Sequence, residues 1–96
     1  PGYTTAKAAT HGLTRGMARD LGKDGIRVNT LVPGWVMTQR QLDLWVDEAA
    51  EREIDERQCL KNRVMPQDIA RMALFLTSDE SRMVTAQNFI VDGGWV

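Results

Sequence analysis

A short apolar run in the first third of the chain limits the possible folds most strongly. Residues Ile26 to Val32 contain alternating apolar and β-branched side chains and run into Pro33-Gly34. This pattern is typical of a β-strand that ends in a turn. A second run, Asn88 to Val91, precedes Asp92-Gly93-Gly94 and predicts another short strand. The chain must therefore bring two strands together across a long intervening segment.

Helical patterns fill most of the remaining sequence. A long helix is predicted from Tyr3 to Leu21, with Gly22 as its C-terminal cap. The segment Gln41 to Arg57 predicts an amphipathic helix or two short ones, and Cys59 to Met65 a linker. Pro66 opens a further helix that stops at Thr77-Ser78-Asp79. The apolar stripes on the first and last of these helices are Ala6, Ala9, Leu13, Met17 and Leu21, and Ile69, Met72, Ala73, Phe75 and Leu76.

The order helix, strand, helix, helix, strand predicts an α/β fold. A crossover between two strands through helices makes the strands parallel and the connection right-handed. Parallel sheets are covered on both faces and have several strands, so two strands alone would leave unpaired edges. We therefore expect residues 1–96 to be one portion of a single larger domain that begins upstream of Pro1.

Charge and composition exclude several classes of function. The formal net charge is −1 and the charged residues are spread along the chain, so neither nucleic acid nor an anionic membrane surface is an expected partner. Cys59 and His11 are the only residues of their types, which leaves no disulfide framework and no zinc-ligand cluster. No apolar run approaches the roughly 20 residues of a membrane span. We expect a soluble cytoplasmic protein without a metal.

Tyr3 and Lys7 are the candidate catalytic pair. They are four residues apart on the predicted helix, and side chains with this spacing share one helix face. A neighbouring ammonium favours the phenolate, which lowers a phenol pKa that is ordinarily about 10. A tyrosine tuned in this way can serve as a general acid or base. The pair alone also fits an ordinary helix, so its interpretation depends on the rest of the chain.

Four motifs together resemble the C-terminal part of a short-chain dehydrogenase/reductase. They are Tyr3-Thr4-Thr5-Ala6-Lys7, Gly25-Ile26-Arg27-Val28-Asn29, Pro33-Gly34-Trp35-Val36-Met37-Thr38 and Asp92-Gly93-Gly94. Each motif is weak alone, but their order and spacing are specific. The resemblance covers the whole chain and implies the C-terminal part of a doubly wound, Rossmann-like parallel sheet.

The resemblance also implies roles for individual residues. Tyr3 would exchange a proton with the substrate oxygen, while Lys7 would lower its pKa and hydrogen-bond the nicotinamide ribose. Pro33-Gly34 would lie against the nicotinamide of NAD or NADP, with NAD preferred. The Val36 backbone would pair with the carboxamide, and the Thr38 hydroxyl would reach the carboxamide or pyrophosphate.

Substrate contacts are implied less specifically. The segment that follows Gly34 would cover the substrate, so Trp35, Gln39 and Arg40 are candidate substrate contacts. Trp35 equally fits a packing role. For residues such as Gln39 and Arg40, a place in a solvated loop is the commoner outcome. Two glycines in the first helix, Gly12 and Gly16, suggest close approach of another backbone.

A narrower resemblance points to the bacterial sugar dehydrogenases of this family. It is carried by the segments Val32 to Thr38, Gln58 to Lys61 and Val91 to Val96. It implies oxidation of an aldose to a lactone; the alternatives are another alcohol or a 3-oxoacyl substrate. One departure is Ala86, where many family members carry glycine.

Assembly provides an interpretation from a different class. The family's homo-tetramers or dimers form through the 3–22 helix and through the C-terminal helix and strand, so the segment could serve mainly in oligomerisation. The glycine-rich phosphate loop, catalytic serine and supporting asparagine of the family would lie upstream of Pro1. We therefore expect the isolated 96-residue chain to be inactive.

Overall fold

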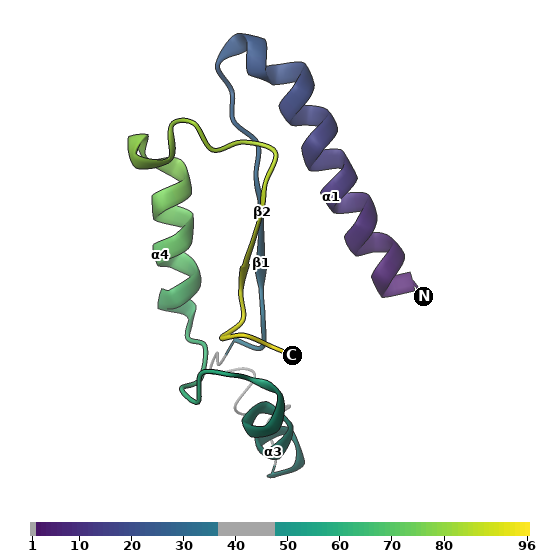
Figure 1. The fold of residues 1–96 in the computed structure, drawn as a ribbon, viewed down its shortest axis with the longest axis vertical. Helices are drawn as coiled ribbons and strands as arrows, with labels where there is room; N and C mark the ends of the chain where they lie inside the picture. The colour runs from purple at the N-terminus through teal and green to yellow at the C-terminus, as the bar shows by residue number, and fades with distance from the viewer. Residues whose placement is uncertain (1, 37–47) are drawn as a thin grey trace. The chain divides into compact units, whose positions relative to one another are not determined.

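The computed structural model describes residues 2–36 and 48–96, without the side chains of Tyr3 and Thr4. The predicted order of helices and strands is confirmed (Figure 1). The described elements are α1 (Gly2–Leu21), η1 (Gly22–Asp24), β1 (Thr30–Pro33), α3 (Glu48–Arg57), α4 (Pro66–Thr77), η2 (Asp79–Ser81) and β2 (Asn88–Val91).

The chain divides into two compact units, which are described separately. The first contains residues 1–31 and 73–89, and the second contains residues 32–72 and 90–96. Strands β1 and β2 form a two-stranded sheet, and both strands pass from the first unit into the second. Helix α4 passes in the opposite direction, from the second unit into the first.

The two strands run parallel, as their order along the chain predicts. In the first unit the amide of Thr30 donates to the carbonyl of Gln87 at 2.9 Å. In the second unit the amide of Gly34 donates to the carbonyl of Val91, also at 2.9 Å. Both partners advance by the same number of residues in the same direction, which is the register of a parallel pair.

Strand β1 starts later than its sequence pattern predicts. The expected strand was Ile26 to Val32, whereas β1 covers only Thr30–Pro33. Before Thr30 the pairing mixes backbone and side-chain bonds. The amide of Ala86 donates to the carbonyl of Val28, but the amide of Val28 donates to the Thr85 hydroxyl, and the Asn29 amide group donates to the carbonyl of Val84. The alternating pattern therefore indicates extended backbone here but not a regular ladder.

Helix α1 ends through a 3₁₀ turn and a left-handed glycine. The sequence places the cap at Gly22, but Gly22 begins η1 and the left-handed residue is Gly25, with φ of 75°. The amide of Gly25 donates to the carbonyl of Gly22, and that of Ile26 to the carbonyl of Leu21. These bonds satisfy carbonyl groups that the helix end would otherwise leave unpaired.

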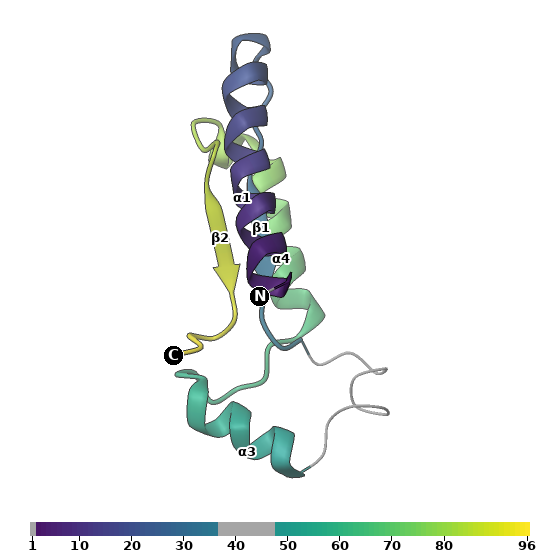
Figure 2. The ribbon, with the colours of Figure 1, turned by 90° about the vertical axis from the view of Figure 1, so that its right-hand side faces the viewer.

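The face of α1 that is buried in the first unit is not the apolar stripe. Thr14 and Ala18 are buried, and the hydroxyl groups of Thr14 and Thr30 are hydrogen-bonded. Leu13 is 63% exposed and Met17 41%. Helical periodicity finds an apolar stripe but does not say what covers it, and here small and hydroxyl-bearing side chains face inward. Within this unit, α1 and the C-terminal half of α4 lie on opposite sides of the strands (Figure 2).

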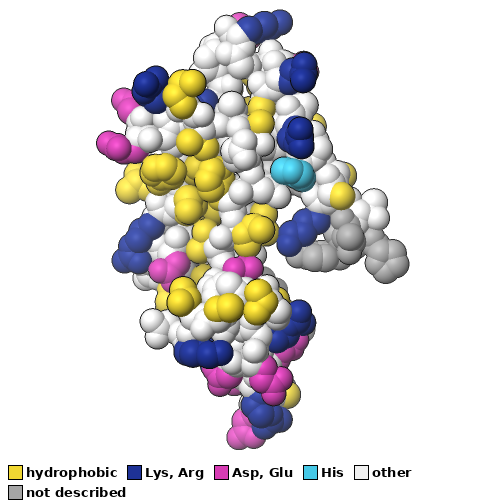
Figure 3. All heavy atoms as spheres, in the orientation of Figure 1, with side chains coloured by type: hydrophobic (Ala, Val, Ile, Leu, Met, Phe, Trp, Pro, Cys, Tyr) yellow, Lys and Arg dark blue, Asp and Glu magenta, His cyan; other side chains and the backbone are white. Residues whose placement is uncertain are grey.

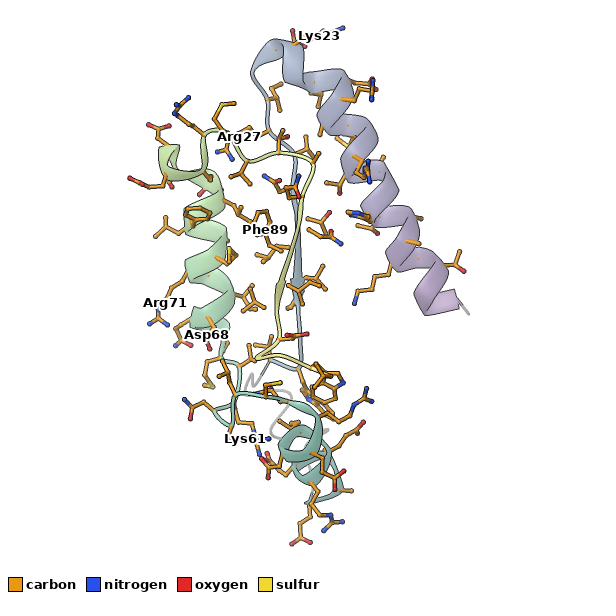
Figure 4. All side chains as sticks on the ribbon, viewed as in Figure 1. Lys23, Arg27, Lys61, Asp68, Arg71 and Phe89 are labelled. Atoms are coloured by element: carbon orange, nitrogen blue, oxygen red, sulfur yellow. The ribbon has the colours of Figure 1, made fainter. Side chains whose placement is uncertain are left out.

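Arg27 ties the segment before β1 to the turn after α4 (Figure 4). Its guanidinium donates to the Ser81 hydroxyl at 3.0 Å and to the carbonyl groups of Val84 and Ser78. Ser81 is fully buried, and its hydroxyl lies within hydrogen-bond distance of carbonyl oxygens at the end of α4. A charged donor shared among three acceptors fixes this turn more firmly than neutral bonds would.

Helix α3 supplies the core of the second unit. Its acidic first turn contains Glu48 and Glu51, which favour a helix N-terminus. Ile54 is fully buried, and Gln58, which follows the helix, is buried with it. The Gln58 amide group donates to the carbonyls of Leu60 and Asn62, and these bonds shape the expected linker. The predicted residues 41–47 lie outside the described residues.

Helix α4 begins and ends where the sequence predicts. The Asp68 carboxylate accepts a hydrogen bond from the amide of Met65 at 2.8 Å, which caps the helix start. No residue of α4 is buried by the described part of the chain. Phe75, which was expected in the buried stripe, is 41% exposed. Apolar side chains gather on the α4 side of Figure 3. The stripe predicted for this helix is therefore only partly covered by the chain itself.

Candidate functional site

Helix α1 carries the first group of candidate residues. Because the helix is continuous from Gly2, the backbones of Tyr3 and Lys7 lie one turn apart on the same face. The side chain of Lys7 is exposed, and that of Tyr3 lies outside the described residues. Both belong to the first unit, whereas Pro33, Gly34 and Val36 belong to the second.

Gly34 stands where no other residue fits. A Cβ atom there would lie 2.5 Å from Cβ and 2.7 Å from Cα of Asp92, far inside normal contact distance. The resemblance implies that Pro33-Gly34 lies against the nicotinamide, which would explain a glycine at this position. The structure shows that the neighbouring strand end already requires it, so the glycine by itself carries no information about a cofactor.

The residues after Gly34 are held by contacts with the C-terminal part of the second unit. The ring of Trp35 packs against that of Trp95, with centroids 6.3 Å apart and planes inclined by 41°. Val36 forms a parallel bridge with Val64, which is buried. Trp35 therefore has the packing partner that one of its two interpretations requires. Pro33 itself is exposed at the end of β1.

Three candidate residues lie outside the described part of the chain. They are Thr38, expected at the cofactor, and Gln39 and Arg40, expected at the substrate. Their assignments stay predictions.

Arg63 is the centre of the main charge cluster in the second unit. Its guanidinium pairs with the carboxylate of Glu51 and, at 2.8 Å, with that of Asp55. Hydrogen bonds from this group to Glu51 and then Asp55 raise the pKa of Arg63 above its ordinary value, because they favour the charged form. The cluster connects α3 to the linker before α4, and its charges are already paired.

The described residues offer no metal centre. Nowhere in residues 2–36 or 48–96 do three His, Cys, Asp or Glu side chains gather closely enough to hold an ion. Over the same residues, no helix combines the length and the apolar character that crossing a bilayer requires.

Sequence reasoning missed the role of the C-terminal tail within the chain. In the sequence, Trp95 stands out only as part of the segment Val91 to Val96, which carries the narrower resemblance. The guanidinium carbon of Arg57 lies 5.3 Å from the centroid of its ring, a cation–π distance. No local signal pairs Trp95 with Trp35, which lies sixty residues earlier. A tryptophan directly after two glycines was the only available hint.

The geometry suits a dinucleotide enzyme at one point. Open α/β sheets bind ligands at the carboxyl ends of their parallel strands. The segment Pro33 to Val36 is at that end of β1, and its backbone is fixed by a hydrogen bond, a close contact and a bridge. A fixed backbone at this edge can present amide and carbonyl groups to a ligand.

Comparison with known proteins identifies the family. A family model described as enoyl-(acyl carrier protein) reductase matches residues 1–96. A probable galactose dehydrogenase of Rhizobium meliloti is 48% identical over 94 residues, covering 98% of this chain and 37% of the relative. A D-xylose 1-dehydrogenase of Caulobacter vibrioides is 45% identical over 93 residues, covering 97% and 37%.

Solved structures agree with this result. The structure of a 4-hydroxyisoleucine dehydrogenase complexed with NADH superimposes with a TM-score of 0.89 at 38% identity, covering 98% of this chain and 39% of that one. The chain thus spans a little more than a third of the length of the proteins it matches. From its fold and from these matches, the chain belongs to the short-chain dehydrogenase/reductase family.

Proposed function

We propose that the protein carrying this chain is an NAD(P)-dependent oxidoreductase that oxidises an aldose at its anomeric carbon to a lactone. The 96 residues are then the C-terminal portion of its dinucleotide-binding domain. The observation that carries the proposal is the placement of Tyr3 and Lys7 one turn apart on α1, in a chain whose relatives include sugar dehydrogenases.

The chemistry assigned to α1 is a proton transfer. The Tyr3 phenolate accepts the proton of the anomeric hydroxyl group as the carbonyl of the lactone forms. Lys7 favours the phenolate through its positive charge and hydrogen-bonds the ribose. A nicotinamide bound beside Pro33-Gly34 would supply the acceptor for the hydride that leaves the same carbon. Coupling the two transfers avoids a charged alkoxide intermediate.

The segment after β1 is proposed to hold the nicotinamide. The Val36 backbone pairs with the carboxamide, the Thr38 hydroxyl reaches the carboxamide or pyrophosphate, and Pro33-Gly34 lies beside the ring. The fixed backbone from Gly34 to Val36 supports this assignment. Gln39 and Arg40 are proposed substrate contacts. The contact between Trp35 and Trp95 favours packing over substrate binding for Trp35.

A substrate panel tests the proposal. The full-length protein is mixed with NAD or NADP and with galactose, xylose or a simple secondary alcohol. Separate reactions combine it with NADH or NADPH and a 3-oxoacyl thioester. We expect reduction of the nicotinamide with at least one aldose and with NAD over NADP. The second candidate is a reductase of a 3-oxoacyl substrate, and a family model described as an acyl-carrier-protein reductase favours this class of substrate. Turnover of the thioester without any aldose activity would establish it instead.

A homo-oligomer, either a tetramer or a dimer, forms part of the proposal. The exposed side chains of Leu13 and Met17 lie on α1 beside Gly12 and Gly16, around which the described chain leaves open space. A second copy could therefore approach this helix closely, with the C-terminal helix and strand as a second contact. Sedimentation of a Leu13→Glu variant should show smaller particles, whereas a Lys23→Glu variant should sediment as the unsubstituted protein does.

The proposed location is the cytoplasm. Cys59 is the single cysteine of the chain, so these residues contain no internal disulfide that an oxidising compartment would favour. Fractionation of cells producing the full-length protein tests this assignment, and recovery of the protein in the periplasmic or membrane fraction would contradict it.

A further inference from the structure

The last four residues of the chain are fastened to the end of α3. The amide of Cys59 donates to the carbonyl of Gly94 at 2.7 Å, and the amide of Leu60 to that of Gly93 at 2.9 Å. The amide of Val96 donates to the carbonyl of Arg57 at 2.9 Å, and Gln58 forms an antiparallel bridge with Trp95. The tail is thus an ordered part of the second unit.

Two left-handed glycines make this attachment possible. Gly93 has φ of 69° and Gly94 of 81°. A Cβ atom on Gly93 would lie 2.7 Å from Cδ of the buried Gln58 side chain. The Asp92 carboxylate accepts a hydrogen bond from the amide of Gly94 at 2.8 Å, which closes the turn. The turn therefore directs the following residue, Trp95, back along the unit.

The end of β2, the turn that follows it and the tail together hold the segment after β1. The carbonyl of Val91 and the side of Asp92 confine Gly34, and the ring of Trp95 packs on Trp35. Arg57 approaches the Trp95 ring and its Nε donates to the carbonyl of Val96 at 3.4 Å, so the ring is itself restrained. The three residues from Gly34 to Val36 therefore lie between a sheet edge and an anchored aromatic side chain.

We propose that Trp95 is a positioning residue for the nicotinamide: it fixes the backbone from Gly34 to Val36 by packing on Trp35. The inference rests on the proposed function, in which the Val36 backbone pairs with the carboxamide. Trp95 itself makes no contact with the cofactor in this account. A backbone that is held in one arrangement before the cofactor binds loses less entropy on binding. Loosening the backbone from Gly34 to Val36 should therefore weaken the contacts with the nicotinamide and not those with the rest of the cofactor.

The test compares two ligands, of which one carries the nicotinamide ring and the other lacks it. Isothermal titration calorimetry of the full-length protein measures the Kd of NADH and of ADP-ribose, or of NADPH and 2′-phospho-ADP-ribose if the unsubstituted protein prefers the phosphorylated pair. Loss of an aromatic pair corresponds to an increase of about tenfold in Kd. We expect Trp95→Ala to raise the Kd of NADH by about that factor and to leave the Kd of ADP-ribose within about twofold.

Two further variants separate positioning from general loosening. Trp95→Phe retains an aromatic ring and should recover most of the lost NADH affinity. Val96→Ala truncates the next side chain, which is 82% exposed, and should bind both ligands as the unsubstituted protein does. The ADP-ribose titration reports that each variant retains a folded cofactor site.

The outcomes are distinguishable from failure of the proposed function. If Trp95→Ala binds NADH normally, or loses NADH and ADP-ribose affinity equally, the positioning role is overturned while the enzyme assignment stands. Equal weakness of Trp95→Phe and Trp95→Ala would also overturn it. If the unsubstituted protein binds no nicotinamide cofactor at all, the proposed function fails and this inference fails with it.

Discussion

The substitution Gly34→Ala tests whether this glycine serves the fold or a cofactor. The added Cβ atom would lie 2.5 Å from Asp92 Cβ and 2.7 Å from Asp92 Cα. Carbon atoms normally approach no closer than about 3.5 Å, so both contacts are short by roughly 1 Å. Because one partner atom is backbone, a change of rotamer cannot remove the overlap, and the two strand ends must separate.

The expected cost is at the upper end for an overpacked site. We expect Gly34→Ala to lower the free energy of unfolding by about 3 kcal/mol. Urea denaturation of the full-length protein without cofactor measures this change. The matched control is Gly22→Ala: no atom lies within 4 Å of its added Cβ and its φ is not left-handed, so a gain of about 0.5 kcal/mol is expected.

Cofactor dependence separates the two explanations. If packing requires the glycine, Gly34→Ala lowers the free energy of unfolding of the unliganded protein by about 3 kcal/mol. If only the nicotinamide requires it, the unliganded protein keeps its normal stability and loses only the extra stabilisation that the ligand provides. An unchanged urea midpoint for unliganded Gly34→Ala would refute the packing argument.

Two other stability changes follow from the structure. Ala86 has φ of 62°, a conformation that costs an alanine about 1 to 2 kcal/mol. Glycine removes this strain but has more conformational entropy to lose on folding, so Ala86→Gly should raise the free energy of unfolding by about 0.5 to 1 kcal/mol. A lower urea midpoint for Ala86→Gly would contradict the strain. Arg63→Met removes two partly exposed ion pairs, so it should lower the free energy of unfolding by about 1 kcal/mol at low salt and by less at high salt. The control Arg71→Met loses one exposed pair and should change the free energy of unfolding by less than about 0.5 kcal/mol. The pKa of Arg63 is raised in the folded chain, so the stability that its charge provides is complete at ordinary pH and is lost only as the pH rises through that raised pKa. If the loss of stability in Arg63→Met disappeared between neutral pH and a pH of about 9, this argument would be refuted.

Local chemistry explains why parts of the fold could be predicted. Helix α4 starts at Pro66, which suits a first helical position, and strand β2 ends before Asp92-Gly93-Gly94, a strong turn signal. Both elements have the bounds that these signals indicate. The parallel order of the strands followed from the helices between them.

Partners distant in the sequence could not be predicted in the same way. The exposed stripe of α1 and its buried Thr14 depend on what packs against the helix, and periodicity carries no information about that. The late start of β1 results from side-chain bonds such as that of Val28 to Thr85, which no local pattern reports. The contact of Trp35 with Trp95 has the same origin.

In the candidate site, too, local features could be predicted and contacts between distant residues could not. The spacing of Tyr3 and Lys7 and the position of Pro33-Gly34 at a strand end are local features, and the structure has both. The requirement for Gly34 is set by Asp92, which lies far away in the sequence. A glycine that is required by packing gives weaker evidence for a ligand than a glycine with open space beside it.

The turnover of a Tyr3→Phe variant tests the central claim most directly. In the full-length protein, the aldose-dependent rate of nicotinamide reduction and the Kd of the cofactor are measured for the unsubstituted protein, for Tyr3→Phe and for the control Lys23→Met. Losing a general acid or base costs about 10² to 10⁴ in rate, so Tyr3→Phe should lose at least a hundredfold in kcat while its cofactor Kd stays within about twofold. A kcat for Tyr3→Phe close to that of the control would contradict the account.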